Sequence, residues 1–202
     1  MPHLLGLTGN IACGKTTIGK MLIELGAARY IDADAVVHDL YRPGQPIYAA
    51  VLHAFGADVL AVDGQIDRKA LGGRVFGDPA ALQQLEAITH PAVHVAVAMQ
   101  LADLPAEAIA VLDAVKLLEG GMARVCEAVW LVICDVGEER RRLIHDRGMT
   151  AAEADARLAA QPNNDDRRPL VNVVIDNSGP LAATQAQVTA AWHQFIAQIT
   201  HT

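Results

Sequence analysis

The segment Gly9-Asn-Ile-Ala-Cys-Gly14-Lys15-Thr16 places two glycines, a lysine and a threonine in the pattern G-x-x-x-x-G-K-[ST]. Glycine suits both positions because a Cβ atom would block the backbone angles and the close approach of a ligand. The successive N–H groups of such a loop, with the helix N-terminus that follows, hold phosphate oxygens. The motif therefore predicts a strand, a phosphate-binding loop and a helix in that order.

The loop also assigns roles to side chains. Lys15 is expected to reach the β- and γ-phosphates of a nucleotide and so to act in catalysis, and the Thr16 hydroxyl is expected to ligate Mg²⁺. A chance match is the alternative, and it arises in roughly one chain of this length per hundred. The predicted nucleotide-binding residues here are Gly9, Asn10, Ile11, Ala12, Cys13, Gly14, Lys15, Thr16 and Thr17.

Cys13 stands at the predicted N-terminus of a helix, a position that lowers the pKa of a thiol. It is expected either to fill a slot for a small residue or to be reactive, so that its oxidation or alkylation blocks nucleotide binding. The other cysteines are Cys126 and Cys134, and no CxxC occurs. An odd number without paired spacing argues against a disulfide framework or a zinc site and favours a reducing, cytoplasmic compartment.

Short apolar strands alternate with helical segments along the chain. Strands are predicted at 3–7, 28–31, 108–114, 127–135 and 171–176, and helices at about 15–25 and across most of 34–103. This order predicts a single α/β domain over 1–202, with the three-layer fold of P-loop NTPases and a five-stranded parallel sheet. Ligands bind at the carboxyl ends of such strands, where the glycine loop, Asp32, Asp34 and Asp113 are expected.

Charge and hydropathy exclude several function classes. The net charge is −7 and the pI about 5.5, so the overall charge gives no sign of nucleic-acid binding. No apolar run approaches the roughly 20 residues that span a bilayer, and no secretory signal is visible. We expect a cytoplasmic protein that acts on a small molecule and binds neither nucleic acid nor membrane. The sequence leaves the oligomeric state open, and a monomer is favoured.

A P-loop supplies a phosphate donor but does not define the acceptor. No NKxD-like guanine motif occurs, which argues against a GTPase. Asp32 and Asp34 follow the second predicted strand, and one such carboxylate can take the proton of an attacking hydroxyl. The alternative is that an aspartate here, Asp34 for example, only caps the helix that follows.

Several motifs together resemble one kinase family. The segments GLTGNIACGKTT, IDADAVVH, PGQPIY, DGQIDRKAL with LEAITHP, and VIDNSG occur in the order and spacing of dephospho-CoA kinases. That family uses ATP to phosphorylate the ribose 3′-hydroxyl of dephospho-CoA, the last step of coenzyme A synthesis. The resemblance covers nearly the whole chain.

The resemblance implies roles on the acceptor side. Asp34 would be the catalytic base, with Asp32 beside it orienting substrate or a metal-bound water. The helical region 36–103 would bind the acceptor. His38, Arg68 and His90 stand at family motif positions there and are predicted substrate contacts. The alternatives are a surface or packing role for Arg68, and a helix break with a capping imidazole at His90-Pro91.

Further roles follow from the same resemblance. Asp113 ends an apolar strand and is predicted to ligate Mg²⁺ indirectly, and Asn177 is predicted to read adenine. A helical lid over about 137–168 would supply an arginine to the transferring phosphate. The family's lid arginine falls on Asp146 here, so Arg147 and Arg142 are the candidates. Arg167 or Arg168 is expected to replace a family lysine.

Two other functions remain open at this point. One is a different small-molecule kinase, for a nucleoside, nucleotide or shikimate, which a substrate panel would reveal. The other is a nucleotide-binding module without turnover, suggested by the altered lid, which would bind ATP without forming CoA.

Overall fold

The protein divides into two compact units. The structure is a computed structural model that describes residues 1–75 and 77–200. The first unit comprises Met1–Ile31 and the chain from Leu104 onward, and the second is Asp32–Asp103. The second unit contains the helical region predicted over 36–103.

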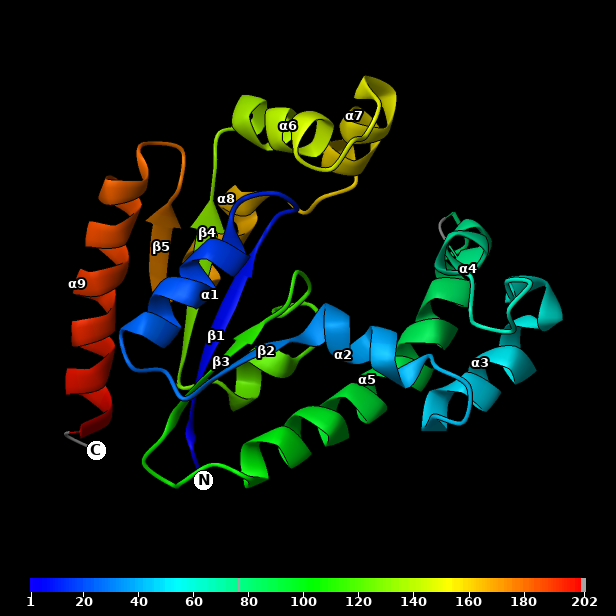
Figure 1. The fold of residues 1–202 in the computed structure, drawn as a ribbon, viewed down its shortest axis with the longest axis horizontal. Coiled ribbons are helices and arrows are strands. Elements are labelled where there is room, and N and C mark those ends of the chain that lie inside the picture. Colours follow the sequence, from blue (N-terminus) through cyan, green and yellow to red (C-terminus); the bar gives the residue numbers. More distant parts are fainter. Residues whose placement is uncertain (76, 201–202) are drawn as a thin grey trace. The chain divides into compact units, whose positions relative to one another are not determined.

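The first unit is built on a parallel sheet (Figure 1). In the described part of the chain the sheet has five strands in the order β2-β3-β1-β4-β5, so the predicted five-stranded parallel sheet is confirmed. Their bounds are β1 His3–Gly9, β2 Arg29–Asp32, β3 Ile109–Asp113, β4 Ala128–Ile133 and β5 Val173–Asp176. Strand β5 begins later than predicted because Asn172 bonds Val129 through both its backbone N–H and its side-chain oxygen.

Helices pack on the sheet because successive side chains of each strand point to opposite faces. Leu5 and Leu7 of β1 join a core cluster with Leu22 of α1 (Lys15–Glu24) and Trp192 of α9 (Leu181–Thr200). On the opposite face, Gly6 leaves room for Leu117, from the segment between β3 and β4 that contains the short helix η2 (Met122–Val125). Figure 1 shows α1 and α9 side by side along one face.

The remaining elements of the first unit follow β4 and precede β5 in the sequence. They are α6 (Val136–His145), α7 (Ala151–Ala159), α8 (Asn164–Arg167) and η3 (Arg168–Leu170). Thr150 and Glu153 form a capping box at the start of α7. Within the polar segment 161–169 the chain forms the single-turn helix α8, which Asn163 caps by accepting the Asp165 N–H.

The second unit is helical, as predicted. It comprises α2 (Ala33–Leu40), α3 (Pro46–Phe55), η1 (Ala57–Val59), α4 (Arg68–Val75) and α5 (Pro79–Ala102). Its own core includes Tyr41, Val51, Phe55 and Leu71. The alternative of a helix break at His90-Pro91 is wrong. Pro91 removes one backbone donor, yet α5 continues through it because α2, α3 and α4 pack along its length.

Candidate active site

The phosphate-binding loop connects the end of β1, the central strand, to the start of α1. Gly14 is the N-cap of α1 and has φ 102°, in the left-handed region that glycine tolerates. A Cβ atom on Gly14 would collide with the side-chain nitrogen of Asn177, and one on Gly9 would collide with the Val132 carbonyl oxygen. Both glycines of the motif are therefore required by close approach of the surrounding protein.

Lys15 points back along this loop. Its Nζ atom donates to the carbonyl oxygens of Gly9 at 2.9 Å and Asn10 at 3.3 Å, and lies 4.0 Å from the Asp113 carboxylate. Only 11% of the Lys15 side chain is exposed. The ammonium group is thus held at the carboxyl ends of β1 and β3, where a nucleotide phosphate is expected.

The oxygen donors near Lys15 suit a magnesium ion. Asp113 ends β3, is buried, and accepts a hydrogen bond from the Tyr30 hydroxyl, while Thr16 is exposed at the start of α1. Mg²⁺ usually takes one or two protein oxygens and completes its shell with water and substrate phosphates. The described residues include no cluster of three or more His, Cys, Asp or Glu that could hold a metal alone. A hydroxyl and one nearby carboxylate fit this type of site.

Four consecutive loop residues are each held by a side chain from elsewhere in the unit. Arg167 donates to the Asn10 side-chain oxygen at 3.3 Å, and the Ile11 N–H donates to Gln161 at 3.0 Å. Arg142 donates to the Ala12 carbonyl at 3.0 Å, and Asn177 donates to the Cys13 carbonyl at 2.8 Å. We call Arg167, Gln161, Arg142 and Asn177 the loop braces. Three of them lie in the predicted lid region, 137–168.

Cys13 does not have the expected lowered pKa. Its side chain is fully buried, and burial raises the pKa of the thiol to about 11, although the Lys15 ammonium acts in the opposite direction. Desolvation therefore outweighs the helix N-terminus, and the alternative of a buried small residue describes Cys13 better than a reactive one.

Asn177 is also committed to the protein. Its side-chain nitrogen donates to Cys13 and its side-chain oxygen accepts from Thr184 at 2.9 Å. Only 5% of the residue is exposed. The side chain thus holds the loop through the Cys13 carbonyl. Adenine recognition by this segment remains a prediction.

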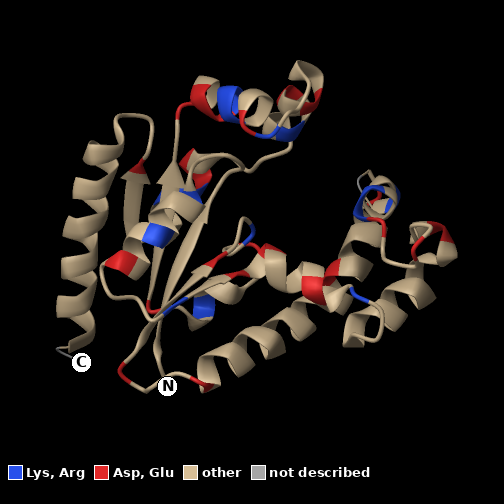
Figure 2. Cartoon of the chain, viewed as in Figure 1, with Lys and Arg blue, Asp and Glu red and all other residues tan. Residues whose placement is uncertain are grey.

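The arginines of α6 differ sharply in what they contact. Arg142 bonds Glu138, the Ala12 carbonyl and the Asn177 carbonyl. Arg141 pairs with Glu138, and Arg140 pairs with Asp155 of α7. Arg147 is exposed beyond the end of α6, and in the described ranges no hydrogen bond or ion pair joins it to the loop. Figure 2 shows these charges gathered on α6 and α7.

The predicted acceptor residues all lie in the helical unit. Asp32 caps α2 by accepting from the Asp34 and Ala35 N–H groups, so the capping aspartate is Asp32. Asp34 is exposed in the first turn of α2, and His38 is exposed one turn later on the same face. Arg68 is exposed at the start of α4, and His90 is half-buried in α5. Helix α5 packs against both α2 and α4.

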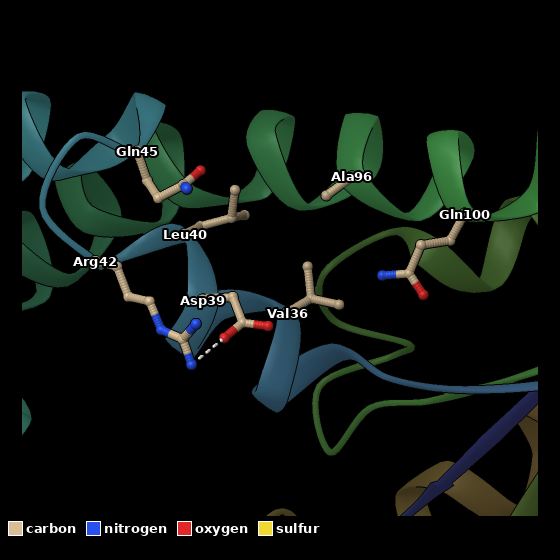
Figure 3. A pocket seen from close by; sticks show the side chains of 7 residues that line it. All are labelled: Val36, Asp39, Leu40, Arg42, Gln45, Ala96 and Gln100. Atoms are coloured by element: carbon tan, nitrogen blue, oxygen red, sulfur yellow. Dashed lines mark ion pairs between the residues drawn. The ribbon is translucent and has the colours of Figure 1, made fainter.

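A hollow of ≈ 310 Å³ lies elsewhere on this unit (Figure 3). Val36, Leu40 and Gln100 line it, together with the ion pair between Asp39 and Arg42 at 2.9 Å. Because Val36 and Leu40 lie roughly opposite to Asp34 and His38 around α2, this hollow is not on the face of the predicted base.

Comparison with known proteins decides the family. A family model described as dephospho-CoA kinase matches residues 3–183. The chain belongs to the dephospho-CoA kinase family. The resemblance found in the motifs is thereby confirmed, and so is the P-loop fold.

Several known proteins match nearly the whole of this chain. A dephospho-CoA kinase of Symbiobacterium thermophilum is 44% identical over 192 residues, which cover 94% of this chain and 80% of that protein. The crystal structure of TT1252 from Thermus thermophilus has a TM-score of 0.81 and 30% identity, covering 94% of this chain and 95% of that one. A dephospho-CoA kinase from Campylobacter jejuni shares the fold, with a TM-score of 0.67 at 22% identity over 98% and 99% of the two chains.

Sequence reasoning missed one residue of the site and left another undecided. Glu139 of α6 is only 2% exposed, and among the described residues its Oε1 atom has no hydrogen-bond partner. Burial raises the pKa of Glu139 to about 7, against the opposing effect of Lys15 and Arg142. Arg167 is buried at 3% exposure, whereas Arg168 is exposed. None of the described helices combines the length and apolar character needed to cross a bilayer.

Proposed function

We propose that this chain transfers the γ-phosphoryl group of ATP to the ribose 3′-hydroxyl of dephospho-CoA, which yields coenzyme A and ADP. The observation that carries this proposal is the family match over 3–183 in a chain whose phosphate loop has the geometry described above. The enzyme is then a phosphotransferase with an alcohol group as acceptor.

The donor side is the phosphate loop of the first unit. Backbone N–H groups of the loop and of the first turn of α1 bind the phosphate oxygens, and the glycines allow that approach. Lys15 exchanges its carbonyl partners for the β- and γ-phosphates. Mg²⁺ held by Thr16 and, through water, by Asp113 would neutralise charge on the β- and γ-phosphates.

The acceptor side is the helical unit. Asp34 takes the proton of the 3′-hydroxyl, whose oxygen bonds to the γ-phosphorus while the bond from that phosphorus to the bridging oxygen of ADP breaks. Asp32, fixed as the cap of α2, holds the Asp34 backbone in place. His38, Arg68 and His90 contact the acceptor in this proposal, with Arg68 suited to its phosphates.

Arg142 and Arg147 are proposed to stabilise the transferring group. Arg142 already lies at the loop, 3.0 Å from the Ala12 carbonyl oxygen, and 22% of its side chain is exposed. Arg147, which is exposed after α6, is proposed to contact the transferring group when the lid closes. Closure of this lid would also exclude water and so suppress hydrolysis of ATP.

The test is a coupled ADP-release assay with dephospho-CoA, in which the product is identified by mass. We expect CoA from dephospho-CoA and little phosphorylation of adenosine, AMP or shikimate. Lys15→Ala is the negative control and should lose most activity. ADP binding without CoA formation would indicate a nucleotide-binding module, and preferred turnover of another alcohol would indicate a different kinase. Either result would overturn the proposal.

A further inference from the structure

Arg167 occupies an unusual position for an arginine. It belongs to the short helix α8, and only 3% of its side chain is exposed. Arginine is rarely buried so fully unless its donors are paired. The partners of this guanidinium therefore show what the residue does.

The guanidinium joins three segments that are far apart in the sequence. Its Nε and Nη2 atoms donate to Glu119 at 3.0 and 2.7 Å, and Nη2 also donates to the Val115 carbonyl at 2.8 Å. Its Nη1 atom donates to the side-chain oxygen of Asn10 at 3.3 Å. The segment after β3, the chain returning from α7 and the phosphate loop thus meet at one planar group.

The electrostatics of this cluster are asymmetric. Glu119 is 42% exposed and lines an open cavity of ≈ 390 Å³, whereas the guanidinium that it pairs with is buried. A carboxylate that remains hydrated contributes little to stability through such a pair. What the pair does provide is a fixed orientation of the guanidinium, because its Nε and Nη2 donors, rigidly held in one plane, converge on the same Glu119 oxygen, Oε1.

The side-chain amide of Asn10 is held at both its oxygen and its nitrogen. The oxygen accepts from Arg167, and the nitrogen donates to the Pro162 carbonyl at 3.3 Å. The next residue, Ile11, is held by Gln161. The first turn of the phosphate loop is therefore positioned by the 161–167 segment, with Arg167 as the link to the segment after β3.

We infer that Arg167 is a positioning residue that holds the first turn of the phosphate loop in the conformation that binds nucleotide. This inference rests on the proposed use of the loop for ATP. Arg168, its neighbour, is exposed, and among the described residues its guanidinium bonds Asp165 at 3.3 Å and does not contact the phosphate loop, so it provides a matched control.

The experiment compares ADP binding by titration calorimetry in four proteins: wild type, Arg167→Met, Arg167→Lys and Arg168→Met. The loss of a hydrogen bond from a charged donor at a buried site typically lowers a binding constant about tenfold. Arg167→Met should therefore weaken ADP binding about tenfold and raise the KM for ATP by a similar factor. The KM for dephospho-CoA at saturating ATP should stay within about twofold. Arg167→Lys keeps a donor and should recover most of the affinity, and Arg168→Met should match wild type.

A folded Arg167→Met protein that binds ADP within twofold of wild type would overturn the inference, and so would an equal loss in Arg168→Met. If Arg167→Met does not fold, Asn10→Ala replaces it. That variant removes the acceptor while leaving the Arg167–Glu119 pair, and unchanged ADP affinity in it would also overturn the inference. Wild-type protein that binds ADP but forms no CoA would overturn the proposed function and leave this inference intact, because the ADP affinities of the four proteins could still be compared.

Discussion

Replacing Glu139 by glutamine should change how the stability of the first unit depends on pH. The Glu139 carboxyl is buried, and its pKa rises from 4.5 to about 7 because burial disfavours the charged form. The charged and titratable groups that interact with it are Lys15 of α1, Arg142 of α6, Asp135 before α6, and the thiols of Cys13 and Cys134. Glutamine keeps the shape and removes the proton equilibrium.

The sign follows from proton uptake. Below about pH 4.5 the carboxyl is protonated in both folded and unfolded chains, so burial carries no ionisation penalty. Between about pH 4.5 and 7 the unfolded chain loses the proton and the folded chain keeps it, so wild-type stability falls as pH rises. A pKa shift of this size corresponds to about 3 kcal/mol in the free energy of unfolding. Solvent reaches the neighbouring Arg142, which is partly exposed, and the resulting screening reduces the expected effect to about 1–2 kcal/mol.

The assay is urea unfolding followed by tryptophan fluorescence. The chain has two tryptophans, Trp130 in β4 and Trp192 in α9, both buried in the unit that contains Glu139. We expect the stability of Glu139→Gln relative to wild type to rise by about 1–2 kcal/mol from pH 5 to pH 8. The control is Glu138→Gln, because hydrogen bonds from Arg141 and Arg142 lower the pKa of Glu138 to about 2 and keep it ionised over this range. Parallel pH curves for wild type and Glu139→Gln would refute the reasoning.

Three further predictions concern the site directly. Asp34→Asn should lower kcat at least about 100-fold with KM values nearly unchanged in steady-state assays, and near-normal turnover would rule out Asp34 as the base. Gly14→Ala should abolish ADP binding in calorimetry, because its Cβ would collide with Asn177. The control is Gly26→Ala, where φ is 111° and the space around the Cβ is open, and this variant should lose only about 1–2 kcal/mol of stability. Since burial raises its pKa to about 11, Cys13 in the native protein should react with a thiol reagent at pH 8 far more slowly than in urea; fast native labelling in peptide mass mapping would contradict this.

The sequence predicts those parts of the molecule whose signal is local. The loop motif needs only eight consecutive residues. Each of the five strands was found as an apolar run between turn residues, because a buried parallel strand is continuously apolar. Boundaries were less exact where a side chain competes with the backbone, as Asn172 does at the start of β5. The short helix α8 was missed because a single turn has no periodicity to detect.

Side-chain partners separated by many residues could not be predicted in this way. Glu138 and Glu139 are adjacent acidic residues in a charged helix, yet one is paired with two arginines and the other is buried without a partner for Oε1 among the described residues. The two residues differ in which side of α6 they lie on, and this depends on how the helix is oriented toward the loop. Likewise, Arg167 and Arg168 look equivalent in sequence, and the choice between them depends on Glu119, 48 residues away.

Ala12 links these observations to the conformation of the loop. Its φ of 62° makes it the one non-glycine residue with positive φ in the described ranges, a conformation that costs an alanine about 1–2 kcal/mol. Its buried methyl group packs in a cluster with Leu143 of α6, and Arg142 binds its carbonyl, so the strain is offset by contacts from the predicted lid region. Moving α6 away would remove those contacts and leave the strain. If this loop conformation is the one that binds nucleotide, as we propose, a lid position that favours it favours nucleotide binding as well, and by thermodynamic linkage bound nucleotide favours that lid position by the same factor.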